Sequence, residues 1–308
     1  MEAVANYTTD LFGNTIKDDV ILRDIYKEPP FSVLDTKSAS WQSRRRQWMH
    51  KGIRSELGRD AVAQTTTQFN RYDGVENNSN DTSIFDPVLC EVLYQWFLPK
   101  WGKVLDPFCG GSVRGIVAAY LGHRYIGIDI RDEQIKSNRQ QAEEILPKEK
   151  DKPVYIVGDS KIALNGPWCH DFDFVFSCPP YGDLEKYSDL PGDVSNMKYT
   201  DFLAAYGDII KQSCNLLKPG GFACFVVGEF RNKAGNYVGF VSDTMRAFVD
   251  AGMGFYNDAV LLNAVGTARL RANNYMKNKK LVKIHQNILV FIKPKLTSAA
   301  GQPAPDTE

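Results

Sequence analysis

Two short motifs, each directly after an apolar run, constrain this chain more than any other feature of its sequence. The first is Asp106-Pro107-Phe108-Cys109-Gly110-Gly111-Ser112, which follows the run Lys103-Val104-Leu105. The second begins 66 residues after the end of the first and is Cys178-Pro179-Pro180-Tyr181, which follows Phe172-Asp173-Phe174-Val175-Phe176. Open parallel sheets bind ligands beyond the carboxyl ends of their strands. Both motifs are therefore expected to face one crevice.

Strand-like and helix-like runs alternate along the chain from about residue 84. We predict strands at 103–108, 124–130, 153–158, 172–177, 221–228, 256–262 and 286–293, and helices at 86–98, 112–121, 131–146, 199–217 and 237–251. This alternation is typical of an α/β protein whose parallel sheet is covered by helices on both faces. The run Lys218-Pro219-Gly220-Gly221 indicates the end of a helix followed by the start of a strand. The last two strands have no predicted helix between them and are expected to form an antiparallel hairpin.

The composition indicates one large α/β domain with appendages. The 308 residues are 43% hydrophobic and 24% charged, as in ordinary globular proteins. No apolar run reaches the roughly 18 residues of a membrane span, and the N-terminus lacks the pattern of a signal peptide, so we expect a cytoplasmic protein without a membrane partner. The six cysteines form no Cys-x-x-Cys pair. This spacing argues against a metal site and against a disulfide framework.

Two segments are basic although the formal net charge of the chain is zero. Residues 38–59 carry six cations and one acid, interleaved with two tryptophans, and residues 265–285 carry six cations and no acid. Such local patches are where nucleic-acid contacts are sought in a protein without overall positive charge. A solvated surface is the alternative for each run. The candidate nucleic-acid contacts are Arg44, Arg45, Arg46, Arg269, Arg271, Lys279 and Lys280.

The glycine-rich turn of the first motif is typical of a nucleotide-like ligand site. Gly110 and Gly111 allow the backbone to approach a ligand closely, and a helix starting near Ser112 directs unpaired N–H groups toward it. Asp129 ends the next strand, where an acid can accept hydrogen bonds from both hydroxyls of a ribose. Dinucleotide sites usually read Gly-x-Gly-x-x-Gly, and this turn does not.

These motifs resemble those of the S-adenosylmethionine-dependent amino-methyltransferases, which read Asp-Pro-Phe-x-Gly-Ser-Gly and (Asp/Asn/Ser)-Pro-Pro-(Tyr/Phe/Trp). Residues 29–36, 41–44, 180–185 and 283–287 are also similar to a set of phage and prophage DNA-modification methylases. The resemblance implies a doubly wound, mostly parallel, seven-stranded methyltransferase (Rossmann-like) sheet with an antiparallel last strand, plus an N-terminal basic extension. It also implies S-adenosylmethionine as cofactor and DNA as partner.

The resemblance assigns cofactor contacts to residues of the first half of this domain. Asp106 would face the ammonium group of the methionine moiety and Asp159 the adenine amino group. A helix N-cap is the alternative for Asp159. Residues 82–87 would pack over the cofactor from the other side, or would simply begin a helix. This chain has Gly-Gly-Ser where the family usually has Gly-Ser-Gly. The full cofactor set is Asp106, Phe108, Gly110, Gly111, Asp129, Asp159 and Ser83.

The resemblance implies that the nucleic-acid base that receives the methyl group binds at the second motif, which is Cys178, Pro179, Pro180 and Tyr181. The side chain before Pro-Pro and the Pro179 carbonyl would accept hydrogen bonds from the amine, and Tyr181 would stack on a base flipped out of the duplex. Cys178 departs from the family pattern, because a thiol is a weak acceptor. It is closest in shape to the serine variant, which leans toward cytosine N4, and it could instead be an inert small residue. Asp183 and Glu185 are candidate proton acceptors, or solvated loop residues.

The function predicted from the sequence is site-specific transfer of a methyl group to cytosine N4 or adenine N6 of DNA, in a bacterial or phage-infected cell, within restriction–modification. Two alternatives remain: an RNA or protein-amide methyltransferase, and a cofactor- and DNA-binding protein without catalysis. The predicted segments are a basic N-terminal segment (1–59), a polar linker (60–81), a methyltransferase domain (82–294) and a disordered tail (295–308).

Overall fold

The computed structural model describes residues 7–9, 15–17, 26–54, 85–148, 151–167, 170–181, 190, 192–263, 265 and 268–295. The predicted linker and nearly all of the predicted tail, from residue 296 on, lie outside these residues. Strands β1 (Tyr7–Thr9) and β2 (Thr15–Lys17) form a separate antiparallel pair.

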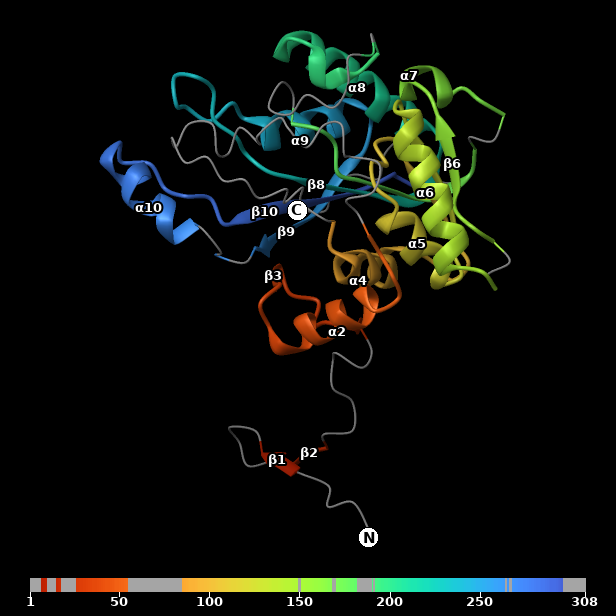
Figure 1. The fold of residues 1–308 in the computed structure, drawn as a ribbon, viewed down its shortest axis with the longest axis horizontal. Coiled ribbons are helices and arrows are strands. Elements are labelled where there is room, and N and C mark those ends of the chain that lie inside the picture. Colours follow the sequence, from red (N-terminus) through yellow and green to blue (C-terminus); the bar gives the residue numbers. More distant parts are fainter. Residues whose placement is uncertain are drawn as a thin grey trace.

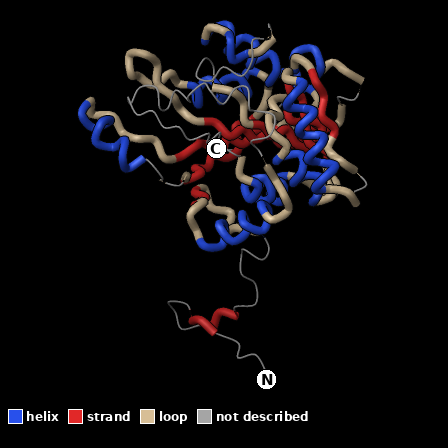
Figure 2. The backbone as a smooth tube through the Cα atoms, in the orientation of Figure 1, coloured by secondary structure: helices blue, strands red, loops and turns tan. Residues whose placement is uncertain are grey.

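The core of the protein is one mixed sheet, with helices packed around it (Figures 1 and 2). Its eight described strands have the order β3-β9-β10-β8-β7-β4-β5-β6. Only β10 runs antiparallel to its neighbours, β8 and β9. This is the Rossmann-like methyltransferase fold, with the antiparallel last strand that was expected. The strands are β3 (Val33–Asp35), β4 (Lys103–Asp106), β5 (Arg124–Asp129), β6 (Val154–Val157), β7 (Phe172–Ser177), β8 (Leu217–Val227), β9 (Gly254–Leu262) and β10 (His285–Ile292).

Helices cover both faces of the sheet and bury two separate apolar layers. On β8, Cys224 and Val226 face one layer, whereas Phe225 and Val227 face the other, as the two-residue period of a strand requires. The first layer packs against α2 (Ala39–Met49), α4 (Pro87–Phe97), α5 (Val113–Tyr120) and α6 (Asp132–Ile145). The second packs against α7 (Ser160–Ala163), α8 (Tyr199–Asn215) and α9 (Phe240–Asp250), with the short 3-10 helix η2 (Val194–Asn196) beside α8.

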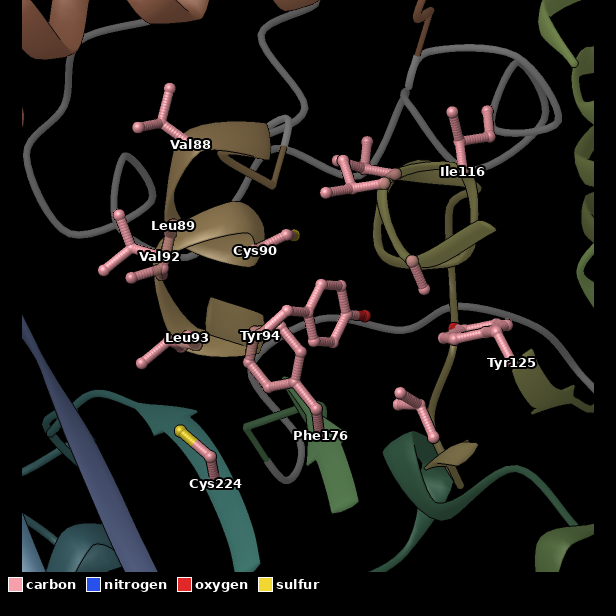
Figure 3. Close-up of a cluster of buried hydrophobic side chains, with 14 of the residues drawn as sticks. Val88, Leu89, Cys90, Val92, Leu93, Tyr94, Ile116, Tyr125, Phe176 and Cys224 are labelled. Carbon is pink, nitrogen blue, oxygen red and sulfur yellow. The ribbon is translucent and has the colours of Figure 1, made fainter. Parts of the chain in front are cut away.

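Aromatic side chains join α4 to the sheet in the first layer. Figure 3 shows Tyr94 of α4 beside Phe176 of β7, and their ring centroids lie 5.5 Å apart in an edge-to-face arrangement. The Tyr94 hydroxyl donates to the main-chain oxygen of Arg114 at 2.9 Å, so its polar tip is satisfied although the side chain is buried. This contact fixes α4 against the start of α5.

Several local features differ from the sequence predictions, which also contained no helix at α2 or α7 and no strands at β1 and β2. The sheet gains an eighth strand, β3, because Leu34 is buried between two exposed neighbours and pairs in parallel with β9. A helix, α10 (Ala268–Lys277), lies in the connection between β9 and β10, although the two strands pair as expected. Strand β8 begins at Leu217, so the Lys-Pro-Gly-Gly run belongs to this strand and forms an irregularity in its pairing with β7.

Helix α2, from the basic N-terminal segment, is anchored to α4 by buried polar contacts. The indole nitrogens of Trp41 and Trp48 donate to Asp86 and Glu91, each at 2.8 Å. Arg44 makes a two-pronged ion pair with Glu91, at 2.7 and 2.6 Å. Glu91 is buried and is the one charged residue of α4, so these donors satisfy its charge. Arg44, a predicted nucleic-acid contact, thus has an internal partner.

None of the helices in the described ranges combines the length and apolar character that a membrane crossing would need.

The Arg44–Glu91 contact predicts different costs for two neighbouring arginines. Arg44→Ala should lower the free energy of unfolding by about 2 kcal/mol, because Glu91 stays buried with fewer donors. Arg46→Ala, at an exposed position of the same helix, should change it by less than about 0.5 kcal/mol. Urea unfolding of both variants measures the difference. Equal losses would show that the ion pair contributes nothing to folding.

Candidate active site at the carboxyl end of the sheet

The two sequence motifs meet where the strand order of the sheet reverses direction. From β4 the chain proceeds outward through β5 and β6, and from β7 it proceeds the other way through β8. Main-chain pairing joins β4 to β7 at Val104–Phe174 and Leu105–Val175, just before the two motifs begin. Such a switch point is the place where doubly wound sheets open a crevice for a ligand.

The glycine-rich turn after β4 is held in a fixed shape by its neighbours. Gly110 has a positive φ of 46°, a conformation that glycine adopts without strain. Its N–H donates to Asp129 Oδ2 at 3.1 Å, and its carbonyl accepts a hydrogen bond from Asn138 Nδ2 at 2.6 Å. The Ser112 hydroxyl at the start of α5 is buried and has no hydrogen-bond partner among the described residues. Gly111 lies half-buried between these two positions.

Asp129 at the end of β5 has the geometry of an acceptor for a pair of hydroxyls. Each carboxylate oxygen accepts one main-chain N–H, from Gly110 and from Arg131. A carboxylate offers about four acceptor positions, so two remain for a ligand. Burial raises the pKa of Asp129, while the Arg131 and Gly110 N–H groups oppose that rise.

Asp106 lies at the centre of a fully buried polar network. Its Oδ2 accepts from Arg114 Nε at 2.6 Å and from the Tyr125 hydroxyl at 2.7 Å. Its Oδ1 accepts from the Ser177 hydroxyl at 2.6 Å and from the Phe108 N–H at 3.2 Å. The residue has no exposed surface. In this structure the Asp106 carboxylate is therefore directed at the protein, and the methionine-facing role expected of it stays a prediction.

Arg114 neutralises Asp106 and also holds the glycine-rich turn. One guanidinium nitrogen donates to the carbonyls of Phe108 and Cys109, at 2.9 and 3.0 Å. The guanidinium lies over the Phe85 ring, 4.6 Å from its centroid. Burial by itself would lower the pKa of Arg114, but Asp106 raises it well above the ordinary value, so the side chain is cationic.

Asp159 follows β6 and serves as the N-cap of α7, which was the alternative left open by the sequence. Its Oδ1 accepts the Lys161 N–H at 2.9 Å. A Cβ placed on Gly192 would lie 3.0 Å from Asp159 Oδ2 and 3.0 Å from the Ile130 side chain, so the backbone at Gly192 borders this corner of the crevice. The capping role uses one oxygen and leaves the adenine contact a proposal.

The second motif presents an aromatic ring that packs against other parts of the second apolar layer. The Tyr181 ring stacks on Phe230, with centroids 6.4 Å apart and an interplanar angle of 22°, and meets Phe240 edge to face. Its hydroxyl accepts from Gln286 Nε2 at 2.9 Å. Pro179 is buried, whereas Cys178 and Pro180 are half-buried. The ring is therefore held by the loop between β8 and α9, by the start of α9 and by β10.

Basic side chains gather over the same end of the sheet. Helix α10 follows β9 at its carboxyl end, where it projects from the body (Figure 1), and carries the exposed Arg269. Lys280 lies directly against Gly235 of the β8–α9 loop. In that loop the Arg231 guanidinium lies over the Tyr237 ring, 3.9 Å from its centroid. Lys279, another predicted contact, is exposed.

Some of the site residues predicted from the sequence lie outside the residues that the structure describes. Ser83, Asp183 and Glu185 lie in undescribed segments, and the Arg271 side chain is likewise not described. Within the described part of the chain no group of three His, Cys, Asp or Glu side chains is placed to hold a metal ion.

The sequence reading missed four residues that complete the site: Arg114, Ser177, Phe230 and Gln286. Arg114 could have been noticed, because it is the one charged residue in the apolar helix Val113–Tyr120. Ser177 could have been noticed as the polar end of an apolar strand. Phe230 contacts Tyr181 from the loop between β8 and α9, and Gln286 contacts it from β10, and no local pattern predicts these contacts.

No protein-family model matches the sequence. Similar solved structures include TrmN from Thermus thermophilus (15% identity, TM-score 0.45, 68% of this chain and 49% of that one), so the chain spans about half of TrmN. A SAM-dependent methyltransferase from Methanosarcina mazei shares 16% identity (TM-score 0.44, 69% and 100%). Magnesium protoporphyrin IX methyltransferase from Synechocystis PCC 6803, with bound SAM, shares 14% (TM-score 0.43, 76% and 94%). These sequence identities and TM-scores are low. The fold is therefore assigned from the strand order of the sheet.

Proposed function

We propose that this protein is an S-adenosylmethionine-dependent methyltransferase whose acceptor is an exocyclic amino nitrogen of a base in DNA. The observation that carries the proposal is the meeting of the Asp106–Ser112 turn and the Cys178–Tyr181 turn at the switch point between β4 and β7. A nucleoside-type cofactor and a planar amine would there lie side by side.

The residues of the cofactor side fit S-adenosylmethionine. Asp129 has two acceptor positions for the ribose hydroxyls, and Gly110 lets the backbone approach the ligand. The unpartnered Ser112 hydroxyl is a further polar group at the same turn. When bound, the cofactor supplies a methyl group on a positively charged sulfur, which an amine lone pair can attack.

The acceptor side fits a flat amine. An amine on an aromatic ring is a weak nucleophile because its lone pair is delocalised into the ring. The Pro179 carbonyl and the Cys178 sulfur would accept hydrogen bonds from the amine hydrogens and so aim the lone pair. Tyr181, held by Phe230 and Gln286, offers a fixed ring for stacking, worth ~1–3 kcal/mol per base. A base in a duplex must flip out to reach it.

The basic surface supports a nucleic acid as the macromolecule. Two segments that are free of acidic residues meet at the carboxyl end of the sheet. They are residues 230–242, from the β8–α9 loop and the start of α9, and residues 263–284 around α10. Together they carry the cations Arg231, Lys233, Arg269, Arg271, Lys277, Lys279, Lys280 and Lys283. Positive charge clustered beside a crevice attracts a phosphate backbone.

Transfer of a radioactive methyl group from labelled S-adenosylmethionine separates the candidate activities. The protein is incubated with unmethylated DNA, with RNA and with unmodified protein, and label is counted in each polymer. We expect label in DNA. Label only in RNA or protein would contradict the acceptor, and label in none of them, with cofactor bound, would indicate a binding protein without catalysis.

Cofactor binding should depend on Asp129. Asp129→Ala should weaken the affinity for S-adenosylhomocysteine by at least about tenfold, because two charged-acceptor hydrogen bonds are lost. Asp132→Ala is the matched control, since that acid lies three residues away and pairs with Lys136. Isothermal titration calorimetry measures both. Unchanged affinity in Asp129→Ala would show that the cofactor site is misplaced.

The acceptor assignment predicts an order among three variants. Cys178→Ser should keep or raise methyl transfer, because a hydroxyl is the better acceptor and nearly as small. Cys178→Ala should cost less than the ~10²–10³-fold typical of losing a strong preorganised donor. Tyr181→Ala should cost more than Cys178→Ala, because stacking holds the flipped base. The rate of labelled methyl transfer is the measurement, and a fully active Tyr181→Ala would exclude this base pocket.

The basic elements predict the salt dependence of DNA binding. Arg269→Glu combined with Lys279→Glu should weaken binding to every DNA sequence and reduce the slope of log affinity against log salt by about 2. Lys211→Glu, an exposed site on α8, is the control and should leave the slope unchanged. Fluorescence anisotropy at several salt concentrations gives the slopes. The same slope in all proteins would mean that α10 is only a solvated surface.

A further inference from the structure

We infer that Asp106 couples the cofactor turn to the acceptor turn, with Arg114 and Ser177 as its two positioning residues. The inference rests on the proposed function, because it concerns the relation between the two halves of that site. It gives Asp106 an internal role, different from direct contact with a ligand.

The coupling contact is a side-chain hydrogen bond that lies just past the last main-chain pair between β4 and β7. That last main-chain pair is Leu105 with Val175. Beyond that pair the Ser177 hydroxyl donates to Asp106 Oδ1 at 2.6 Å and bridges the ends of the two strands. Both side chains are fully buried, so water does not compete for the bond.

Asp106 is the first residue of the cofactor turn, and Ser177 directly precedes the acceptor turn. Asp106 precedes Pro107 and accepts the Phe108 N–H, so its carboxylate closes the first part of the cofactor turn. Ser177 precedes Cys178, the first residue of the acceptor turn. A shift of the Asp106 carboxylate would therefore move both turns.

Arg114 extends the bridge into the cofactor turn. It donates to Asp106 Oδ2 and to the carbonyls of Phe108 and Cys109, so one planar group spans four residues of the turn. Lysine has a single point of charge and cannot reproduce this fork. Tyr125 from β5 donates to the same carboxylate oxygen and fixes it from the opposite side of β4.

Substitution of Ser177 and substitution of Arg114 should affect two different quantities, kcat and the affinity for S-adenosylhomocysteine. Ser177→Ala frees the acceptor turn while Arg114 still holds the cofactor turn. S-adenosylhomocysteine affinity should then stay unchanged and kcat should fall about 10- to 100-fold, as misplaced reactive groups produce. Arg114→Lys loosens the cofactor turn, so it should weaken S-adenosylhomocysteine binding about tenfold or more, which corresponds to at least one lost hydrogen bond to a charged group.

The experiment measures S-adenosylhomocysteine affinity by calorimetry, kcat by labelled methyl transfer to DNA, and thermal unfolding of each variant. Ser213→Ala is the matched control. Ser213 is also a buried serine, and its hydroxyl donates one hydrogen bond, to the Ile209 carbonyl within α8. Both serine variants should lose similar thermal stability, and Ser213→Ala should keep kcat. If Arg114→Lys fails to fold, the Ser177→Ala and Ser213→Ala comparison alone decides.

The outcomes separate this inference from the proposed function. Wild-type protein that binds no S-adenosylhomocysteine would overturn both. Wild-type protein that binds it and methylates DNA, with Ser177→Ala as active as Ser213→Ala, would overturn the coupling alone. An equal loss of affinity and of kcat in Ser177→Ala would also overturn the coupling. It would show that Ser177 does not act on the acceptor turn separately from the cofactor turn.

Discussion

The buried ion pair between Asp106 and Arg114 is the interaction on which the rest of this site depends. Both side chains lie inside the protein, and charges there are tolerated only when they are paired and their remaining hydrogen-bonding positions are filled. Asp106 meets that condition with four donors from β5, β7, α5 and its own turn. Removal of one member of such a pair typically costs about 3–5 kcal/mol, so the network specifies one geometry for the crevice.

This geometry links ordinary folding physics to the proposed chemistry. The side chains of each strand alternate between the two faces of the sheet and so create two core layers. The parallel strands all have their carboxyl ends at one edge of the sheet. The polar groups needed for function are confined to that edge. Tyr181 gains its fixed orientation from Phe230 in the β8–α9 loop and from Gln286 of β10, on the β8 side of the switch point.

Local patterns predicted most of the fold, because strand and helix signals in this chain are strong and bounded by glycine, proline and capping residues. They missed the short elements β3 and α7, of three and four residues. They also missed α2 and α10, whose many arginine, asparagine and other polar residues leave no clear apolar face. In the site, Gly110 and Asp129 were predicted from motif spacing and do meet. The internal pairing of Asp106 was not predicted, since it depends on Arg114, Tyr125 and Ser177 from three different elements.

A crystal structure of the protein with bound S-adenosylhomocysteine tests the central claim most directly. The account predicts that the ribose hydroxyls lie within hydrogen-bond distance of Asp129, about 2.7 Å. It also predicts that Asp106 keeps its contacts with Arg114 and Ser177 while the ligand occupies the crevice. A complex in which the ligand's ammonium group displaces Arg114 from Asp106, or in which the ligand lies away from the switch point between β4 and β7, would contradict it.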